Sequence, residues 1–353
     1  MAFDPLEFHT AAVKTPSHES VSEMRSLLVD SLDGLGFEPV VDARGNTIVT
    51  RRATADGPHL VLNTHLDTVS PPVAYERVGS TVYGRGACDA KGPLAALLGA
   101  FYGVSVERGR LTLAVTPDEE TGSLGADALA FDADGYIVGE PTGLDVCTGA
   151  RGRFEGTITI NGTNAHAANP AAGTNAIVGV PPVLEALKTF DSEYGPGTHS
   201  TLGEPTLTPT VIEGGDAVNQ LPAECTIAID RRSVPPESAH EFERALNEHL
   251  QTTGVDASFA LTDRESPFLE AFATAHDETL VETLQNAGAG EPRPFGAATE
   301  AAYFADEPTV VFGPGVLVDD EGPVAHADRE YIERDTIVRA TEILERAIGS
   351  FLG

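Results

Sequence analysis

Several short apolar runs in this chain end at, or shortly before, histidine, aspartate and glutamate residues, whose side chains are common metal ligands in proteins. HLVLNTH ends at His65, LTLAVTPD is followed by Glu119 and Glu120, GYIVG by Glu140, and PTVVFGPG stands before His326. Runs rich in Val, Leu and Ile are typical of buried parallel strands. Helical stretches such as GPLAALLGAFYGV alternate with them, which predicts an α/β fold with a mostly parallel sheet. Because sites form beyond the carboxyl ends of such strands, we expect these side chains to converge.

Together the candidate ligands offer two imidazoles and five carboxylates. They are His65, Asp67, Asp89, Glu119, Glu120, Glu140 and His326. Zinc binds both kinds of donor, and two neighbouring divalent ions can share a carboxylate while another serves as a base. Each motif alone has an ordinary explanation: a His-x-Asp surface pair, a solvated Glu-Glu face or a GEPT turn. Their joint occurrence favours a two-zinc amidohydrolase.

Five segments, in this order, resemble the M20 family of metallopeptidases and deacylases. They are HLDTV, GRGACDAKG, DEETGSLGA, GEPT and AHADRE. They are most similar to the acetylornithine deacetylase and succinyl-diaminopimelate desuccinylase branch. The resemblance extends from TPSHES near the N-terminus to AHADREYI, and it is specific only as an ordered set.

The resemblance implies a role for each ligand. Asp89 bridges two metal ions, Glu120 and His326 complete one site, and His65 and Glu140 complete the other. Zinc is the expected metal, with Co²⁺ or Mn²⁺ as possible substitutes.

By the same resemblance, Glu119 is the general base and Asp67 orients the ring of His65. A ligand histidine usually donates its second ring N–H to an oxygen acceptor, which Asp67 can supply. In the expected reaction the metals lower the pKa of a bound water toward about 7. Glu119 takes its proton, hydroxide attacks the acyl carbon, and Glu119 then protonates the leaving amine.

The length of the chain, and a change from alternating buried strands and helices to an α+β pattern in its middle, predict two domains. Residues 1–150 and 265–353 form the catalytic α/β domain, and residues 151–264 form an inserted α+β domain with alternating strands such as FEGTITING. In the resembling family this insertion pairs with its copy, so we expect a homodimer.

The insertion carries three candidate site residues by resemblance. His166, in TNAHAANP, would reach the partner's site and stabilise the oxyanion, although the segment departs from the commoner His-Ser pattern and an ordinary loop histidine is the alternative. Asn219 would contact the substrate, and Arg231 would bind its carboxylate as a bidentate donor. Arg232 takes that role if the strand register differs by one residue.

Glu300, in ATEAAYF, resembles the acetylornithine deacetylases and could face the cationic side chain of ornithine. A helix-start carboxylate is the alternative. The favoured substrate is N-acetylornithine. Alternatives are a succinyl-diaminopimelate desuccinylase, an aminoacylase or dipeptidase, and a hydrolase that releases lysine or ornithine from a small acidic carrier protein. A metal-binding module without catalysis is a further alternative, against which the base Glu119 argues.

The chain has 54 acidic and 22 basic residues, for a formal net charge of −32. Such repulsion destabilises a folded chain unless salt screens it, so we expect adaptation to high ionic strength. Nucleic acid and anionic membranes are unsuitable partners for so negative a surface. The acids are dispersed and 41% of residues are hydrophobic, which argues against a disordered acidic chain.

Three cysteines, Cys88, Cys147 and Cys225, show no metal-type spacing, and an odd number argues against a disulfide framework. Cys88 stands beside Asp89, where a small apolar filler is favoured over a ligand. No apolar run reaches the length of a membrane span, and MAFDPLEFHTAAV lacks the features of a signal peptide. We therefore expect a cytoplasmic protein.

Overall fold

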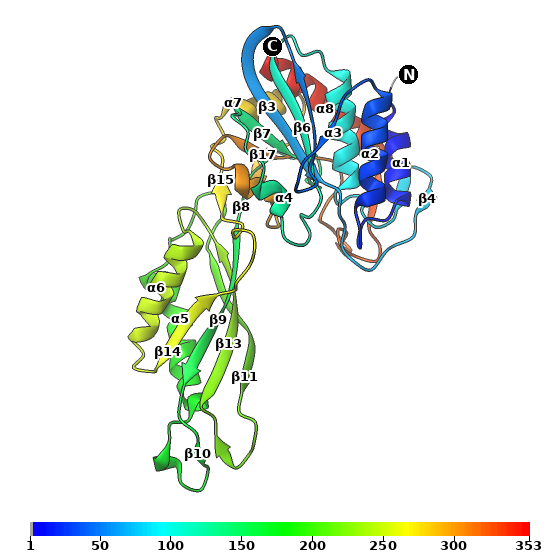
Figure 1. Cartoon of the computed structure of the whole chain (residues 1–353). Coiled ribbons are helices and arrows are strands. Elements are labelled where there is room, and N and C mark those ends of the chain that lie inside the picture. The colour runs from blue at the N-terminus through cyan, green and yellow to red at the C-terminus, as the bar shows by residue number, and fades with distance from the viewer. Residues whose placement is uncertain (1–2) are drawn as a thin grey trace. The chain divides into compact units, whose positions relative to one another are not determined.

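The apolar runs that precede the candidate ligands form adjacent strands of one sheet (Figure 1). In the computed structural model, which describes residues 3–353, the strand order at the centre of this sheet is β6 (Arg108–Thr116), β3 (Ala55–His65), β7 (Gly135–Val138) and β17 (Thr309–Val311). All three pairings are parallel. The predicted α/β fold with a mostly parallel sheet is confirmed.

Antiparallel strands extend the sheet at both edges. β2 (Thr47–Arg52) pairs with β6, and β1 (Val40–Val41) pairs with β2. On the other side, β8 (Cys147–Ala150) runs antiparallel to β17 and parallel to β16 (Arg293–Pro294). Such antiparallel edges are common in large mixed sheets.

The other elements of this unit cover or connect the sheet. They are α1 (Pro5–Lys14), α2 (Ser22–Gly34), β4 (Glu76–Val78), β5 (Thr81–Tyr83), α3 (Lys91–Gly103), α4 (Leu124–Asp127), α7 (Thr279–Asn286), the 3₁₀ helix η3 (Glu300–Phe304), β18 (Val318–Asp319), β19 (Gly322–Pro323), β20 (Tyr331–Glu333) and α8 (Arg334–Leu352). β20, β5 and β4 form a small antiparallel sheet. That sheet places the segment after His326 beside the segment that leads to Asp89.

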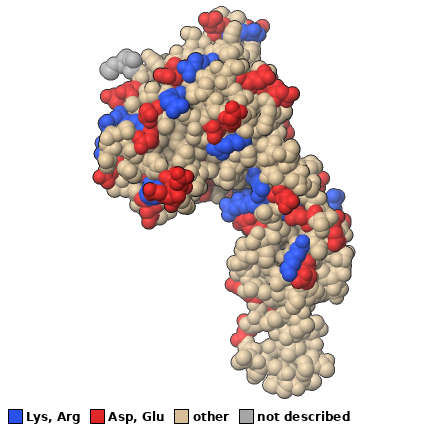
Figure 2. Space-filling model, turned by 180° about the vertical axis from the view of Figure 1, so that it is seen from behind, with Lys and Arg blue, Asp and Glu red and all other residues tan. Residues whose placement is uncertain are grey.

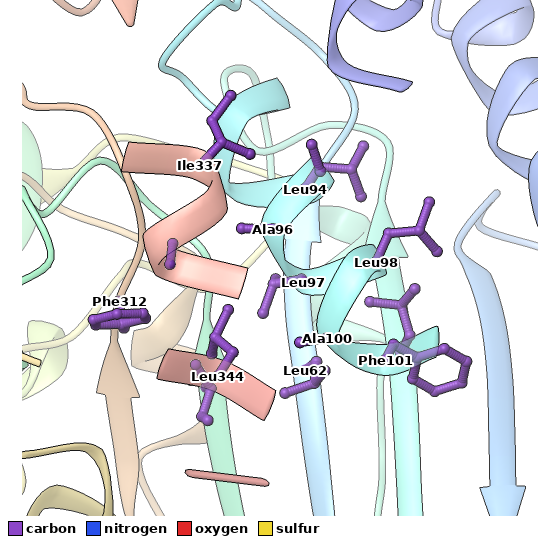
Figure 3. Packing of buried hydrophobic residues seen from close by; sticks show 14 of the residues in the cluster. Leu62, Leu94, Ala96, Leu97, Leu98, Ala100, Phe101, Phe312, Ile337 and Leu344 are labelled. Atoms are coloured by element: carbon purple, nitrogen blue, oxygen red, sulfur yellow. The ribbon is translucent and has the colours of Figure 1, made fainter. Parts of the chain in front are cut away.

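Helix α3 anchors the loop that precedes it. Eleven of its thirteen residues are buried, as expected of a helix that is apolar on all sides. Leu97 and Phe101 belong to the main core together with Leu344 of α8 (Figure 3). Gly99 allows α8 to approach closely, since a Cβ at that position would lie 2.9 Å from Thr341 Cγ2. The loop that carries Asp89 is therefore attached to a rigid, buried helix.

The second unit is an antiparallel sheet with two helices and a core of its own. The strand order is β11 (Thr206–Gly214), β13 (Glu224–Ser233), β9 (Gly152–Asn161) and β14 (Ala257–Leu261). Helices α5 (Val180–Glu193) and α6 (Ala239–Gln251) contribute apolar residues to that core. The remaining elements are β10 (Ala165–His166), η1 (Pro170–Ala172), η2 (Ala176–Gly179), β12 (Gln220–Leu221) and β15 (Phe272–Ala273).

The second unit spans Ala150–Ala273, and the first unit consists of the segments that end at Gly149 and resume at Thr274. It thus extends beyond the expected end at residue 264. Two contacts explain the difference: the backbone N–H of Arg153 donates to the carbonyl oxygen of Leu269 at 2.9 Å, and the rings of Phe154 and Phe268 meet edge to face. Within residues 3–353, no helix is both long and apolar enough to cross a membrane.

Candidate active site

His65 is the last residue of β3, and carboxylate groups lie on both sides of its ring. Nδ1 lies 3.1 Å from the carbonyl oxygen of Asp67 and 3.2 Å from Asp67 Oδ1. Nε2 lies 3.3 Å from Asp89 Oδ1. This nitrogen is buried and makes no hydrogen bond of ordinary geometry within the described part of the chain. In a histidine that binds a metal ion, one ring nitrogen usually faces a protein oxygen and the other binds the metal. His65 has this arrangement, with Nδ1 facing Asp67 and Nε2 available to a metal ion.

Asp89 lies just before α3, with one histidine at each carboxylate oxygen. Oδ1 faces His65, and Oδ2 lies 3.2 Å from His326 Nε2. Burial alone would raise the pKa of Asp89, but the neighbouring imidazoles of His326 and His65 hold that pKa well below its usual range. The Asp89 carboxylate therefore lies between two imidazoles, where it could contact two metal ions.

Two groups of side chains could each hold a metal ion, and Asp89 belongs to both. One group is His65, Asp89 and Glu140, and the other is Asp89, Glu120 and His326. Within each group the ligand atoms lie within 4.8 Å of one another. These are the same sets of residues that the sequence suggested for the two metal sites.

The carboxylates at this place oppose one another's ionisation. Burial raises the pKa of Glu140 well above its ordinary value, and the charge of Asp89 raises it further. Burial also raises the pKa of Glu119, and the negative charges of Glu140 and Glu300 raise it further. Divalent cations among these oxygens would offset the repulsion, and the imidazole and carboxylate donors suit zinc. The donor set therefore fits a pair of divalent metals.

His326 lies between β19 and β20 with a left-handed backbone, at φ 63°. This conformation costs a residue with a side chain about 1–2 kcal/mol, so contacts elsewhere must hold the loop. Nε2 lies 3.0 Å from Glu120 Oε1. Hydrogen bonds with Asp89 and Glu120 raise the pKa of His326 to about 10. A metal ion would have to displace that proton to bind here.

Asp67 connects the segment of His65 to the segment of the two glutamates. Its Oδ1 accepts the backbone N–H of Glu119 at 3.1 Å, and its Oδ2 accepts that of Glu120 at 3.0 Å. The same carboxylate faces His65 Nδ1. Asp67 thus fixes the neighbouring glutamates as well as the histidine ring, which is a wider role than the sequence suggested.

We expect Asp67→Asn to weaken metal binding by about 10–100-fold, as loss of a group that orients metal ligands does. An amide has one acceptor oxygen, so its NH₂ would oppose a backbone N–H of Glu119 or Glu120. Chelator competition measures the change. Asp118→Asn is the matched control, because Asp118 accepts the N–H groups of Leu124 and Gly125 in the same loop. Equal loss in both variants would mean that Asp67 only stabilises the loop.

A profile of Peptidase family M20/M25/M40 matches residues 61–350, which contain all the candidate ligands. The chain belongs to this peptidase family. It is therefore a metal-dependent hydrolase of amide bonds.

Solved structures share the fold at low sequence identity. The aminopeptidase PepT from Bacillus cereus ATCC 10987 is 20% identical, with a TM-score of 0.80 over 99% of this chain and 98% of that one. The M20 family metallo-carboxypeptidase Sso-CP2 from Sulfolobus solfataricus is 18% identical, with a TM-score of 0.76 over 99% of both chains. The YXEP protein from Bacillus subtilis, a dinuclear metal binding peptidase, is 13% identical, with a TM-score of 0.73 over 98% and 96%.

Glu300 was expected to face a cationic substrate, but the structure places it in the protein interior. Its side chain is almost completely buried at 1% exposure, and its Oε2 accepts a hydrogen bond from Thr116 at 2.7 Å. Burial raises its pKa to about 8. A carboxyl group so enclosed contributes to the electrostatics around Glu119 and does not offer a surface for an ornithine side chain.

Arg231 does not have the substrate-binding position that the resemblance implied. It is fully buried, and its guanidinium forms two hydrogen bonds with Glu237, both at 2.8 Å, and one with Asp191 at 2.7 Å. The rings of Phe190 and Phe242 lie over it. Its position in β13 directs it into the core of the second unit, so it cannot bind a substrate carboxylate.

His166 and Asn219 lie close to each other at one end of the second unit, and both are exposed. β10 pairs His166 with Gln220 of β12, and the carbonyl oxygen of Asn219 accepts the N–H of Ala167 at 2.8 Å. His166 Nδ1 accepts the N–H of Ala168 at 3.1 Å. A neutral ring in that arrangement carries its proton on Nε2 and can donate it outward.

Two residues near the metal groups were not singled out from the sequence. Thr299 Oγ1 donates to Glu140 Oε1 at 3.2 Å, and the buried Glu330 contacts the loop of Asp89. Their only sequence signal is nearness to Glu300 and His326. Cys88 is buried and free, and it belongs to neither metal group.

Proposed function

We propose that this M20 family member is a two-zinc amidohydrolase that releases an amino acid from an N-acyl derivative. The observation that supports it is the pair of metal-binding groups that share Asp89, with Glu119 adjacent to Glu120. His65 and Glu140 would hold one ion, and Glu120 and His326 the other.

The bound metals would supply an acidified water and polarise the scissile carbonyl. Glu119 accepts a proton from that water, and burial raises the pKa of its carboxyl group, which makes the carboxylate a stronger base. Glu119 then returns the proton to the leaving amine nitrogen. Asp67 holds the backbone of Glu119 throughout. His166 of a partner subunit donates its Nε2 proton to the developing oxyanion.

Arg232 is the remaining candidate for the substrate carboxylate, with Asn219 beside the substrate. Arg232 lies on the opposite face of β13 from Arg231, its side chain is 37% exposed, and it contacts Asp230 at 2.8 Å. Arginine suits an α-carboxylate because its planar fork forms paired hydrogen bonds.

N-acetylornithine is the substrate that we favour on the resemblance of the ordered motifs alone, since Glu300 does not face a substrate; it would place the enzyme in amino-acid biosynthesis. The alternatives are a succinyl-diaminopimelate, an acyl amino acid or dipeptide, and lysine or ornithine on a small acidic carrier protein. The structural neighbours include dipeptidases, which supports the dipeptide alternative.

A substrate panel with zinc at molar KCl tests this proposal. It compares amine release from N-acetylornithine, N-acetyllysine, N-succinyl-diaminopimelate, a dipeptide and an aminoacylated carrier protein. We expect N-acetylornithine to have the highest kcat/KM. A higher value for another member would reassign the substrate, and hydrolysis of none of them by the zinc-loaded protein would contradict the proposed function.

We further propose that the enzyme is a homodimer formed through the second unit. β11 is an edge strand exposed along almost its whole length, and Val211 and Ile212 are more than half exposed. The sequence between Glu155 and Glu185 contains no charged residue, and Figure 2 shows an uncharged surface at the β10 end of this unit. Two copies of so acidic a chain repel least where charge is absent.

The free, buried cysteines agree with a reducing cytoplasm, which we propose as the location. We also propose that the enzyme is adapted to high salt, because of its net charge of −32.

We expect dialysis from molar KCl into dilute buffer to lower the melting temperature, dissociate the dimer and release zinc. At about 0.01 M salt the Debye length is roughly 30 Å, against roughly 3 Å at 1 M, so acidic groups across a whole face then repel. Metal removal should add to the effect, since zinc offsets local carboxylate charge. Calorimetry between about 0.05 M and 2 M KCl, with and without chelator, measures it. A constant melting temperature would refute the salt adaptation and leave the catalytic proposal intact.

A further inference from the structure

We propose that the buried ion pair of Glu330 and Arg85 is a positioning device for the metal centre. It fixes the relative places of the three segments that carry His65, Asp89 and His326. This inference rests on the proposed metal-binding role of those residues.

Glu330 holds the backbone of Asp89 directly. Its side chain is completely buried, and Oε1 accepts the backbone N–H groups of Cys88 at 3.1 Å and Asp89 at 3.2 Å. Its own carbonyl oxygen accepts the N–H of Gly84 at 3.1 Å. One residue of the segment after His326 therefore fixes both ends of the loop that leads to Asp89.

Arg85 extends this connection to the other two segments. Nη1 donates to Glu330 Oε2 at 2.7 Å and to the carbonyl oxygen of Ala327 at 3.2 Å. Nε donates to the carbonyl oxygen of Pro71 at 3.0 Å. Ala327 follows His326 directly, and Pro71 belongs to the segment that continues from His65.

The small net stability expected of a buried ion pair also indicates a positioning role. A buried ion pair contributes little net stability compared with apolar residues of the same volume. A further carboxylate beside a group of buried acidic residues is unfavourable by itself, because like charges repel. What it provides is two fixed hydrogen bonds to the backbone of the bridging ligand's loop.

The fixed loops explain how His326 keeps its left-handed backbone. The residues on its C-terminal side are bound to Arg85 and, through Glu330, to the loop of Asp89. His326 Nε2 thereby stays at 3.2 Å from Asp89 Oδ2. Without these hydrogen bonds the histidine and the bridging carboxylate would move independently.

Glu330→Gln tests the proposal, with Glu333→Gln as the matched control. Glu333 lies three residues further along the same segment and accepts hydrogen bonds from Ser80 and Thr81, but it does not contact the Asp89 loop in the described structure. Each full-length protein is purified at molar KCl. Zinc affinity is measured by chelator competition, the visible spectrum is recorded after cobalt substitution, and the melting temperature is determined.

We expect Glu330→Gln to weaken binding of at least one zinc ion by about 10–100-fold and to change the cobalt spectrum. Glu333→Gln should keep the wild-type affinity and spectrum even if its melting temperature falls. Wild-type affinity and spectrum in Glu330→Gln would overturn the positioning role. Failure of the wild-type protein to bind metal would instead overturn the metal centre itself.

Arg85→Lys decides the matter if Glu330→Gln does not fold. Lysine keeps the positive charge opposite Glu330 but cannot donate in the fixed fork that reaches Ala327 and Pro71. We expect an altered cobalt spectrum and weaker zinc binding. A spectrum and affinity equal to those of the wild type would contradict the proposal.

Discussion

Glu119→Gln should retain both metal ions and lose at least two orders of magnitude in kcat. General base catalysis is worth about 10²–10⁴-fold, and glutamine is similar in size but cannot accept a proton from water. The backbone N–H of residue 119 would still donate to Asp67, so the loop should keep its geometry. The substitution therefore removes a proton acceptor and leaves the metal-binding groups in place.

Metal analysis of the same protein separates this effect from damage to the site. Glu120→Gln and Asp89→Asn should lose metal, because both residues belong to a metal-binding group. Glu119 belongs to neither group, and its variant should bind zinc as the wild type does. Near-normal turnover in Glu119→Gln would show that another residue is the base.

The central sheet could be predicted because its strands are short, apolar and interrupted by helical segments. Burial on both faces leaves little alternative to a parallel α/β sheet. The order of the ligand motifs then suggested which residues share a metal, and the structure places those residues in two groups around Asp89. That assignment came from the family resemblance, whereas the local patterns predicted only that the side chains converge, because each lies at or near the end of a strand or beside a helix start.

Arg231 and Arg232 show how strand register decides which of two neighbouring side chains is buried. In β13, Cys225, Ile227 and Ile229 are buried and alternate with residues that are only partly buried. The period of two places Arg231 on that same face. A register count along the strand would have assigned Arg232 to the open face.

Glu300 and Glu330 could not be placed from sequence, because their surroundings come from distant segments. Thr116 and Glu300 are 184 residues apart, and Glu330 meets the Asp89 backbone across 241 residues. The hydrophobic periodicity of a segment carries no information about contacts with distant segments. A glutamate near a ligand motif therefore gives no sign in the sequence of whether its side chain is buried.

His166→Ala should reduce kcat by about 10²–10³-fold, the usual loss when one oxyanion donor is removed. His166 is exposed and carries its outward proton on Nε2, since Nδ1 accepts the N–H of Ala168. If it acts on the partner's metal centre, each site is composed of two subunits. His240→Ala is the matched control, because His240 is an exposed histidine of the same unit, 94% exposed on α6, and its loss should leave kcat unchanged.

Mixed dimers can show whether the site is shared. A dimer of one His166→Ala subunit and one Glu119→Gln subunit has one site with both Glu119 and His166 intact, and one site with neither. Random exchange in equal amounts makes half of the dimers mixed, so activity should recover to about a quarter of the wild-type value. Each variant alone should stay nearly inactive, and native mass spectrometry can establish that subunits exchange. Verified exchange without recovery would mean that His166 does not act across a dimer, whereas recovery would show that the second unit completes the active site of its partner.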